Sequence, residues 1–466
     1  MQVCPQMRVT LLTVAQTIEG RISMIYDFPC MNRSEDVSQW PVGVGGIPAV
    51  LPDGTLVNLP VLKGVNVITY GVVGTGKTNL YTSNAAEILL SSVPDMRGVF
   101  FEIKNSFIKH FMKDGDKVIT HNPRTVPSNN LFIPNIIKEI RQASDSEAEM
   151  REIADFLFEE LLSEANQNRA WIEAARNTFT AVLRTIVDCY PNANTGNWTL
   201  INALRRMTTK ELLTYLARHP RNHSMLRKDW GFNPMGKEEY ETNRRAADIQ
   251  FFLNAVLEMF SGSFEMDGED TIHDWLNGKY GKNLFFMYDI ASAQISRPFF
   301  LYYMKKIKDF KLSNCTGNTP SILMVLDEID KMADNGKSAD WGIFQAANLG
   351  REYNLQILLT TQSIENLYGL SADFNEHITT GGLAGFPYQI SFRPGDPTTI
   401  SVLQTLYGSE YREHLVLPAS RYAEPVMKCE LEPIVTDAEF ASLDMGDCIV
   451  KIMSHRPQRV HIKMNF

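Results

Sequence analysis

One glycine-rich loop constrains the fold more than any other feature of this sequence. Residues 71–78 read Gly-Val-Val-Gly-Thr-Gly-Lys-Thr and fit the pattern G-x-x-x-x-G-K-[S/T] in full. Glycines let the backbone N–H groups of such a loop turn inward around a polyphosphate, and the helix that follows adds its positive amino end. An apolar run at 65–70 precedes the loop, and a helix-like stretch at 79–90 follows it. The sequence therefore predicts a strand, a phosphate-binding loop and a helix in this order.

The same pattern assigns roles to the polar side chains of the loop. The ammonium group of Lys77 is expected to neutralise the β- and γ-phosphates of ATP. The hydroxyl group of Thr78 is expected to ligate Mg²⁺. The remaining residues of the predicted phosphate cradle are Gly71, Gly74, Thr75 and Gly76.

A second carboxylate is needed to hold the metal ion. The apolar run at 322–326 ends in Asp327 and Glu328, as expected for a buried strand whose last side chains emerge at the carboxyl edge of a parallel sheet. Asp327 is predicted to join the Mg²⁺ site, and Glu328 to act as the general base that polarises the attacking water. Taken alone, an apolar strand ending in Asp-Glu is a weak signal, and it gains its meaning from the loop at 71–78.

Two further polar residues are associated with the next predicted strand, at 357–362. Gln362 ends this strand and is predicted to sense the γ-phosphate and the water; the simpler alternative is an amide that caps a loop. Arg351 precedes the strand and is predicted to reach across a subunit boundary, where it would stabilise the charge that develops in phosphoryl transfer. The simpler alternative for Arg351 is a solvated surface charge.

The alternation of strands and helices predicts an α/β fold with a mostly parallel sheet, interrupted by a helical insert. Residues 1–60 are expected to form a strand-rich segment, and residues 61–139 and 281–466 the nucleotide-binding domain. Between them, residues 140–280 show the i, i+3, i+4, i+7 rhythm of amphipathic helices and are expected to form an all-α domain.

Composition excludes several classes of protein. The 45 basic and 54 acidic side chains give a net charge of −9, so a contact with nucleic acid must be local rather than spread over the surface. The six cysteines are scattered without a C-x-x-C pair, which favours free, buried thiols in a reducing compartment. No stretch reaches the ~18 uncharged apolar residues of a spanning helix, and the start has no pattern of a secretory signal. We therefore expect a soluble, cytoplasmic protein.

With these residues assembled, the chain resembles the coupling ATPases of conjugative type IV secretion systems, the TraD/TraG group within the FtsK/HerA class of DNA-pumping motors. The resemblance covers most of the length and rests on an ordered set of motifs. These are Val44-Gly45-Gly46-Ile47-Pro48, the loop at 71–78, the segments at 101–107, 117–123, 171–176 and 271–276, and Gly350-Arg351-Glu352-Tyr353 before Thr361-Gln362.

This resemblance implies a RecA-like motor domain with an inserted all-α domain, a homo-hexameric ring, and ATP-driven passage of DNA through a central pore. Arg351 looks like the trans-acting finger of that family, and Gln362 like its strand-end sensor. The all-α domain would receive a relaxase or a secreted protein. Family members usually begin with transmembrane helices, and this sequence shows none. Either a partner at the inner face of the cell membrane or in the secretion channel tethers the ring, or the chain is a soluble branch of the family with a different location. The segment at 102–106 lacks the proline and glycine usual in the family, so no role is carried over to Lys104.

Two other functions compete with a DNA motor. The chain could be a receptor for cargo proteins whose ATPase controls assembly, or a P-loop transferase that acts on a small molecule. A basic stretch from Arg218 to Lys228, followed by Trp230, offers a DNA contact in the insert, although such runs are usually solvated surface.

Overall fold

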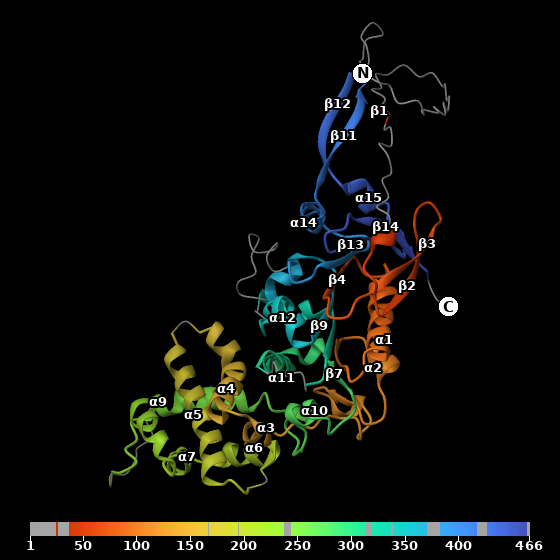
Figure 1. Ribbon diagram of the computed structural model, residues 1–466. Coiled ribbons are helices and arrows are strands. Elements are labelled where there is room, and N and C mark those ends of the chain that lie inside the picture. Colours follow the sequence, from red (N-terminus) through yellow and green to blue (C-terminus); the bar gives the residue numbers. More distant parts are fainter. Residues whose placement is uncertain are drawn as a thin grey trace.

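One large β-sheet runs through the middle of the molecule (Figure 1). The structure is a computed structural model that describes residues 25–26, 37–165, 167–193, 195–236, 244–313, 319–336, 339–370, 383–416 and 426–463. Eleven of the described strands form this sheet. Their order is β3 (Leu56–Val61), β2 (Gly45–Val50), β14 (Gln458–Ile462), β13 (Asp447–Ile452), β10 (Tyr388–Ser391), β4 (Val67–Tyr70), β9 (Leu355–Thr361), β8 (Ile322–Asp327), β5 (Arg97–Glu102), β7 (Asn283–Met287) and β6 (Lys117–Ile119).

The strands from β10 to β6 all run parallel, whereas β13, β14, β2 and β3 pair antiparallel at one side. All residues of β8 and β9 are buried. Burial along the whole strand requires cover on both faces of the sheet, which is the usual setting of a parallel sheet. The predicted α/β fold with a mostly parallel sheet is therefore confirmed. The hairpin β2–β3 also shows that strands from residues 45–61 belong to this same sheet.

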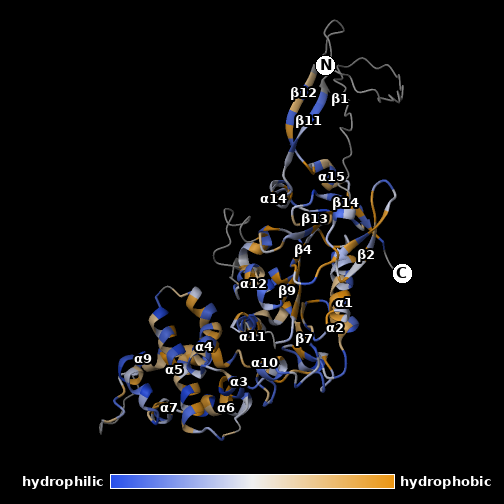
Figure 2. Ribbon diagram, viewed as in Figure 1, coloured by the Kyte–Doolittle hydropathy of each residue, from blue (hydrophilic) through white to orange (hydrophobic). Residues whose placement is uncertain are grey.

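Helices cover the two faces of the sheet. Side chains alternate along β5, so that Val99 and Phe101 enter one hydrophobic core while Phe100 enters the other. The helices next to Phe100 contribute Leu89 and Phe107, and those on the opposite face contribute large aromatic side chains. Figure 2 shows hydrophobic residues along the strands of the sheet and on the helices beside it. These helices are α1 (Ser83–Ser92) and α2 (Ser106–Phe111) on the first face, and α11 (Ala293–Ser313) and α12 (Ile343–Leu349) on the second.

A group of helices lies beside α11 at the lower left of Figure 1. Within the described residues of 136–276, no strand is present, as the sequence predicts for the insert. The exact boundaries of the domains stay a prediction. The main helices of this helical region are α3 (Ile136–Gln142), α4 (Ser146–Ser163), α5 (Arg169–Cys189), α6 (Asn197–Arg206), α7 (Thr209–Leu216), α9 (Arg244–Leu257) and α10 (Ile272–Leu276).

At the opposite end of the molecule, a long hairpin projects from the sheet (Figure 1). It consists of β11 (Ser409–Val416) and β12 (Val426–Pro433), and β1 (Ile25–Tyr26) pairs with the outer edge of β11. The hairpin follows α14 (Pro397–Tyr407) and precedes α15 (Asp437–Ala441). Its cross-strand neighbours Tyr411 and Leu431 are 74% and 61% exposed, which leaves an apolar face open to solvent.

The expectation of buried thiols is only partly correct. Cys448 is buried in β13, but Cys189 and Cys429 are exposed, because they lie at the last residue of α5 and on the projecting hairpin. All three are free thiols, as predicted. The other three cysteines lie outside the described residues. No helix in the described ranges combines the length and the apolar character that a membrane crossing needs.

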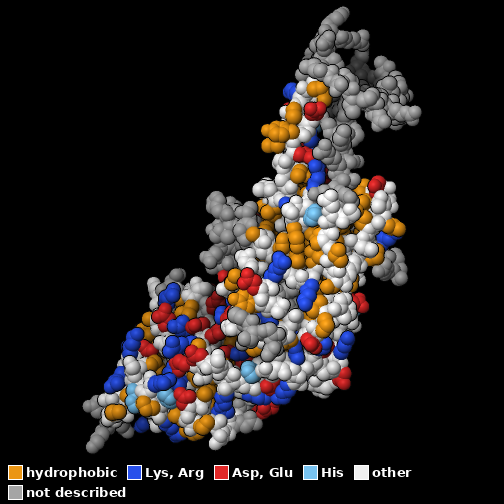
Figure 3. Space-filling view, in the orientation of Figure 1, with side chains coloured by type: hydrophobic (Ala, Val, Ile, Leu, Met, Phe, Trp, Pro, Cys, Tyr) orange, Lys and Arg blue, Asp and Glu red, His pale blue; other side chains and the backbone are white. Residues whose placement is uncertain are grey.

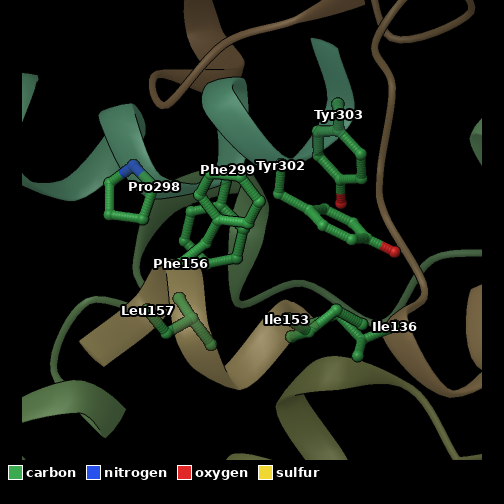
Figure 4. Close-up of a pocket in the computed structure, with 8 residues that line it drawn as sticks. All are labelled: Ile136, Ile153, Phe156, Leu157, Pro298, Phe299, Tyr302 and Tyr303. Atoms are coloured by element: carbon green, nitrogen blue, oxygen red, sulfur yellow. The ribbon is translucent and has the colours of Figure 1, made fainter. Parts of the chain in front are cut away.

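Helices α4 and α11 join the helical region to the sheet through an apolar seam (Figure 4). Its side chains enclose a cavity of about 10 Å³ and come from α3, α4 and α11. Next to the seam, the ammonium group of Lys306 on α11 lies 2.6 Å from Glu149 Oε1 and 3.4 Å from Glu139 Oε1. Glu139 Oε2 also accepts a hydrogen bond of 2.7 Å from the backbone N–H of Ile272, at the start of α10. Lys306 thus neutralises two carboxylates in the junction between the two parts of the chain.

We expect the substitution Lys306→Met to lower the free energy of unfolding by about 3 kcal/mol, because it leaves two largely buried carboxylates without their cation. The side chains of Glu139 and Glu149 are only 3% and 11% exposed. Chemical denaturation monitored by tryptophan fluorescence measures this loss. Lys63→Met, at an exposed lysine, is the matched control and should stay within about 0.5 kcal/mol of the parent. Equal stability of the two variants would contradict the role given to Lys306.

Candidate active site

The glycine-rich loop follows β4 at the carboxyl edge of the parallel sheet. Gly71 and Gly76 have φ values of +144° and +102°, which favour glycine. A Cβ atom on Gly76 would lie 2.4 Å from Leu80 Cδ1, so the side chain of Leu80 would have to shift to admit it. The chain then enters a wide helical turn, η2 (Lys77–Thr82), which continues as α1. The predicted order of strand, loop and helix is confirmed.

Lys77 lies over its own loop. Its ammonium group donates hydrogen bonds to the carbonyl oxygens of Gly71 and Val72, the second at 3.0 Å. Burial lowers the pKa of Lys77, while the nearby carboxylates Asp327 and Glu328 oppose this shift. A buried cation beside a glycine-rich loop forms a site for an anion.

The end of β8 meets the start of η2 at this loop. The hydroxyl group of Thr78 lies 3.1 Å from Asp327 Oδ1 and 3.3 Å from Oδ2. Burial and the neighbouring Glu328 raise the pKa of Asp327 to about 6. A hydroxyl and a carboxylate oxygen are the hard donors that Mg²⁺ prefers. The donor set and the glycine cradle therefore fit a Mg²⁺-bound nucleotide.

Glu328 and Gln362 are in direct contact. Gln362 Nε2 donates a hydrogen bond of 2.9 Å to Glu328 Oε1. This contact follows from the sheet order, because β9 lies between β4 and β8 and its end is therefore flanked by the loop and by Asp327. The backbone of Glu328 has a φ of +54°, an uncommon conformation for a residue with a side chain. Five of the polar residues singled out in the sequence, at 77, 78, 327, 328 and 362, thus lie at one edge of the sheet.

Two residues of this site were not predicted. Lys104, after β5, places its ammonium group 3.1 Å from Glu328 Oε1. Lys104 lies close behind β5, and β5 pairs in parallel with β8, so both strands end at the same edge of the sheet. The sequence alone does not specify that these two strands are neighbours. Asp330 follows in η8 (Ile329–Gly336) and is buried, which raises its pKa to about 6.

Arg351 lies far from this edge. It is exposed in η9 (Gly350–Tyr353), before the first residue of β9, and its side chain passes near Gly64 before β4. The loop at 71–78 instead follows the last residue of β4, and β4 and β9 are parallel neighbours. The length of β9, about 20 Å, therefore separates Arg351 from the loop of its own chain. The side chain of Arg351 therefore does not reach the loop of its own chain.

Two side chains of the predicted basic stretch in the helical region have structural partners, whereas Arg218, Arg221, Arg227 and Lys228 are exposed. Trp230 is fully buried, and its Nε1–H donates a hydrogen bond of 2.9 Å to Thr178 Oγ1. His219 Nε2 lies 2.9 Å from Asp188 Oδ2. The interpretation of Trp230 as a surface for nucleic acid is therefore wrong. Over the visible face of the helical region, basic and acidic side chains are mixed (Figure 3).

Comparison with solved structures identifies a shared fold. The bacterial conjugative coupling protein TrwBdeltaN70 in its unbound monoclinic form superimposes with a TM-score of 0.63 and 15% identity, covering 87% of this chain and 86% of that chain. The plasmid coupling protein TrwB in complex with ADP and Mg²⁺ gives 0.60 and 16%, with the same coverage. VirB4 of Thermoanaerobacter pseudethanolicus gives 0.50 and 14%, covering 91% of this chain and 97% of that chain. These likenesses establish an α/β RecA-like P-loop fold with a helical region.

Comparison with protein families identifies the family as well as the fold. A search of curated proteins finds no match at the significance applied. The family model described as "Type IV secretion-system coupling protein DNA-binding domain" matches residues 60–459, which is most of the chain. This chain therefore belongs to the family of type IV secretion-system coupling protein DNA-binding domains.

Proposed function

We propose that this chain is a Mg²⁺-dependent ATPase that forms a ring and couples hydrolysis to the passage of DNA into a type IV secretion channel. The observation that carries the proposal is the convergence of Lys77, the Thr78–Asp327 pair and the Glu328–Gln362 pair on one glycine loop. Relatives of the same fold bind ADP with Mg²⁺, an ATP analogue and a GTP analogue, which supports a nucleotide at this site.

Each residue has a defined part in this hydrolysis. The loop amides and Lys77 bind the phosphates, and Thr78 with Asp327 would hold Mg²⁺, which supplies positive charge against the phosphate oxygens. The carboxylate of Glu328 accepts a proton from the attacking water. Gln362, fixed at the end of β9, contacts Glu328 and is placed to transmit the state of the phosphates to the rest of the sheet.

The position of Arg351 supports a ring. An arginine accelerates phosphoryl transfer by stabilising charge in the transition state. Because Arg351 is about 20 Å from the loop of its own chain, it can act only at the site of a neighbouring copy. A closed ring, which we propose to be a hexamer, gives every site such a neighbour.

DNA is the substrate that the family description favours. A ring can present a few basic side chains per subunit to a narrow pore, so the net charge of −9 is no obstacle to DNA binding.

The alternative function is that of a receptor that binds a cargo protein through the helical region and uses ATP for assembly. The rigid junction at Lys306 would transmit motion from the sheet to that region in either case.

Two substitutions separate binding from turnover. Lys77→Ala should weaken nucleotide binding, because the phosphates lose their buried cation. Glu328→Gln should keep binding and lower kcat by about 10²–10⁴-fold, because an amide cannot accept the proton. Nucleotide titration and phosphate-release kinetics measure the two effects. If Glu328→Gln hydrolyses ATP at the parent rate, the proposed site is wrong.

The same phosphate-release assay, with and without single- or double-stranded DNA, separates the motor from the receptor. If DNA raises the rate of phosphate release by the parent but not by Glu328→Gln, the result supports the DNA motor. A parent rate that ignores DNA but rises with a cargo protein supports the receptor.

Arg351→Ala should lower the rate of a ring by about 10³-fold. Mixed with Glu328→Gln subunits, it should regain activity, because a subunit with an intact loop then receives Arg351 from its neighbour. Each variant alone is the control. If no mixing ratio restores activity, the trans role of Arg351 is excluded.

A further inference from the structure

The carboxylate of Glu328 receives two donors on one oxygen atom. Gln362 Nε2 lies 2.9 Å and Lys104 Nζ 3.1 Å from Oε1, and neither of these two contacts uses Oε2. The side chain of Glu328 is 13% exposed, whereas that of Lys104 is 61% exposed. A solvent-exposed lysine therefore reaches over a largely covered carboxylate at the centre of the site.

We propose that Lys104 is a positioning residue for Glu328, an inference that rests on the proposed ATPase function. Two donors that converge on Oε1 fix the plane of the carboxylate. The lone pairs of Oε2 are then left for the attacking water. Lys104 acts through Glu328 and does not itself contact the nucleotide.

The backbone around Lys104 is built to hold it in place. The buried carboxylate of Glu102, at the end of β5, accepts hydrogen bonds of 2.8 and 2.7 Å from the backbone N–H groups of Phe107 and Ile108. Asn105 directly precedes α2 and has a φ of +57°. Lys104 thus lies in a short turn that is anchored on both sides, which limits the positions its side chain can take.

Electrostatics give Lys104 a second effect on the same carboxylate. Asp327 and Glu328 are adjacent and carry like charges, which repel each other. Without a cation, Glu328 would be pushed away from Asp327 and toward solvent. Lys77 is committed to its own loop through Gly71 and Val72, so Lys104 supplies the cation that contacts Glu328.

Loss of Lys104 should affect the rate of hydrolysis much more than the stability of the chain. An ion pair with one exposed partner contributes little to folding, so the stability of the chain should not depend on Lys104. Loss of a group that orients a catalytic side chain typically lowers activity by 10- to 100-fold. The effect of Lys104 should therefore appear in kcat alone.

The test compares three variants of the full chain in steady-state ATP hydrolysis. Lys104→Met should lower kcat about tenfold, while the KM for ATP and the affinity for a fluorescent ADP analogue stay within about twofold. Lys104→Arg should recover at least half of the parent kcat, because its guanidinium group also donates to Oε1. Lys109→Met, at an exposed lysine of α2, is the matched control and should behave as the parent.

Other outcomes overturn the inference. An unchanged or raised kcat in Lys104→Met excludes positioning, and a raised KM with normal kcat places Lys104 on the nucleotide instead. Glu328→Gln, assayed in parallel, distinguishes a failure of the role of Lys104 from a failure of the proposed ATPase function. If Glu328→Gln is inactive and Lys104→Met is normal, only the role of Lys104 fails. If Glu328→Gln turns over like the parent, the proposed function fails and the inference with it.

Discussion

The parallel register of four buried strands is the constraint on which the candidate site depends. Strands β4, β9, β8 and β5 lie side by side and end at the same edge of the sheet. Residues that follow these strands must therefore meet there, although 258 positions separate Lys104 from Gln362. The strands are buried on both faces, so a shift of register would expose their apolar side chains. Hydrophobic burial thus places the polar groups of the site.

Much of this arrangement can be predicted from the sequence, because its signals are local. The glycine pattern at 71–78 and the apolar run before Asp327 each define a strand end without reference to other segments. The contact between Lys104 and Glu328 could not be predicted in this way, since it depends on which strands are neighbours. Burial of Trp230 and exposure of Cys189 were missed for the same reason. Composition and spacing do not report which face of a helix meets another helix.

The same sheet connects the site to the helical region. Helix α11 leads toward β8 along the chain, and its Lys306 lies between Glu139 of α3 and Glu149 of α4. A change at Asp327 or Glu328 could therefore reach the helical region through one strand and one helix. The buried ion pairs resist separation of the two parts, because breaking them would leave charges uncompensated. We expect the sheet and the helical region to move together.

We propose that one nucleotide site needs two copies of the chain. The most direct test of this proposal is the rate of ATP hydrolysis per subunit over a dilution series, with the size of the particles measured by light scattering in the same samples. The account predicts that the rate per subunit falls in parallel with the fraction of assembled chains. A constant rate per subunit, maintained where only single copies remain, would contradict it.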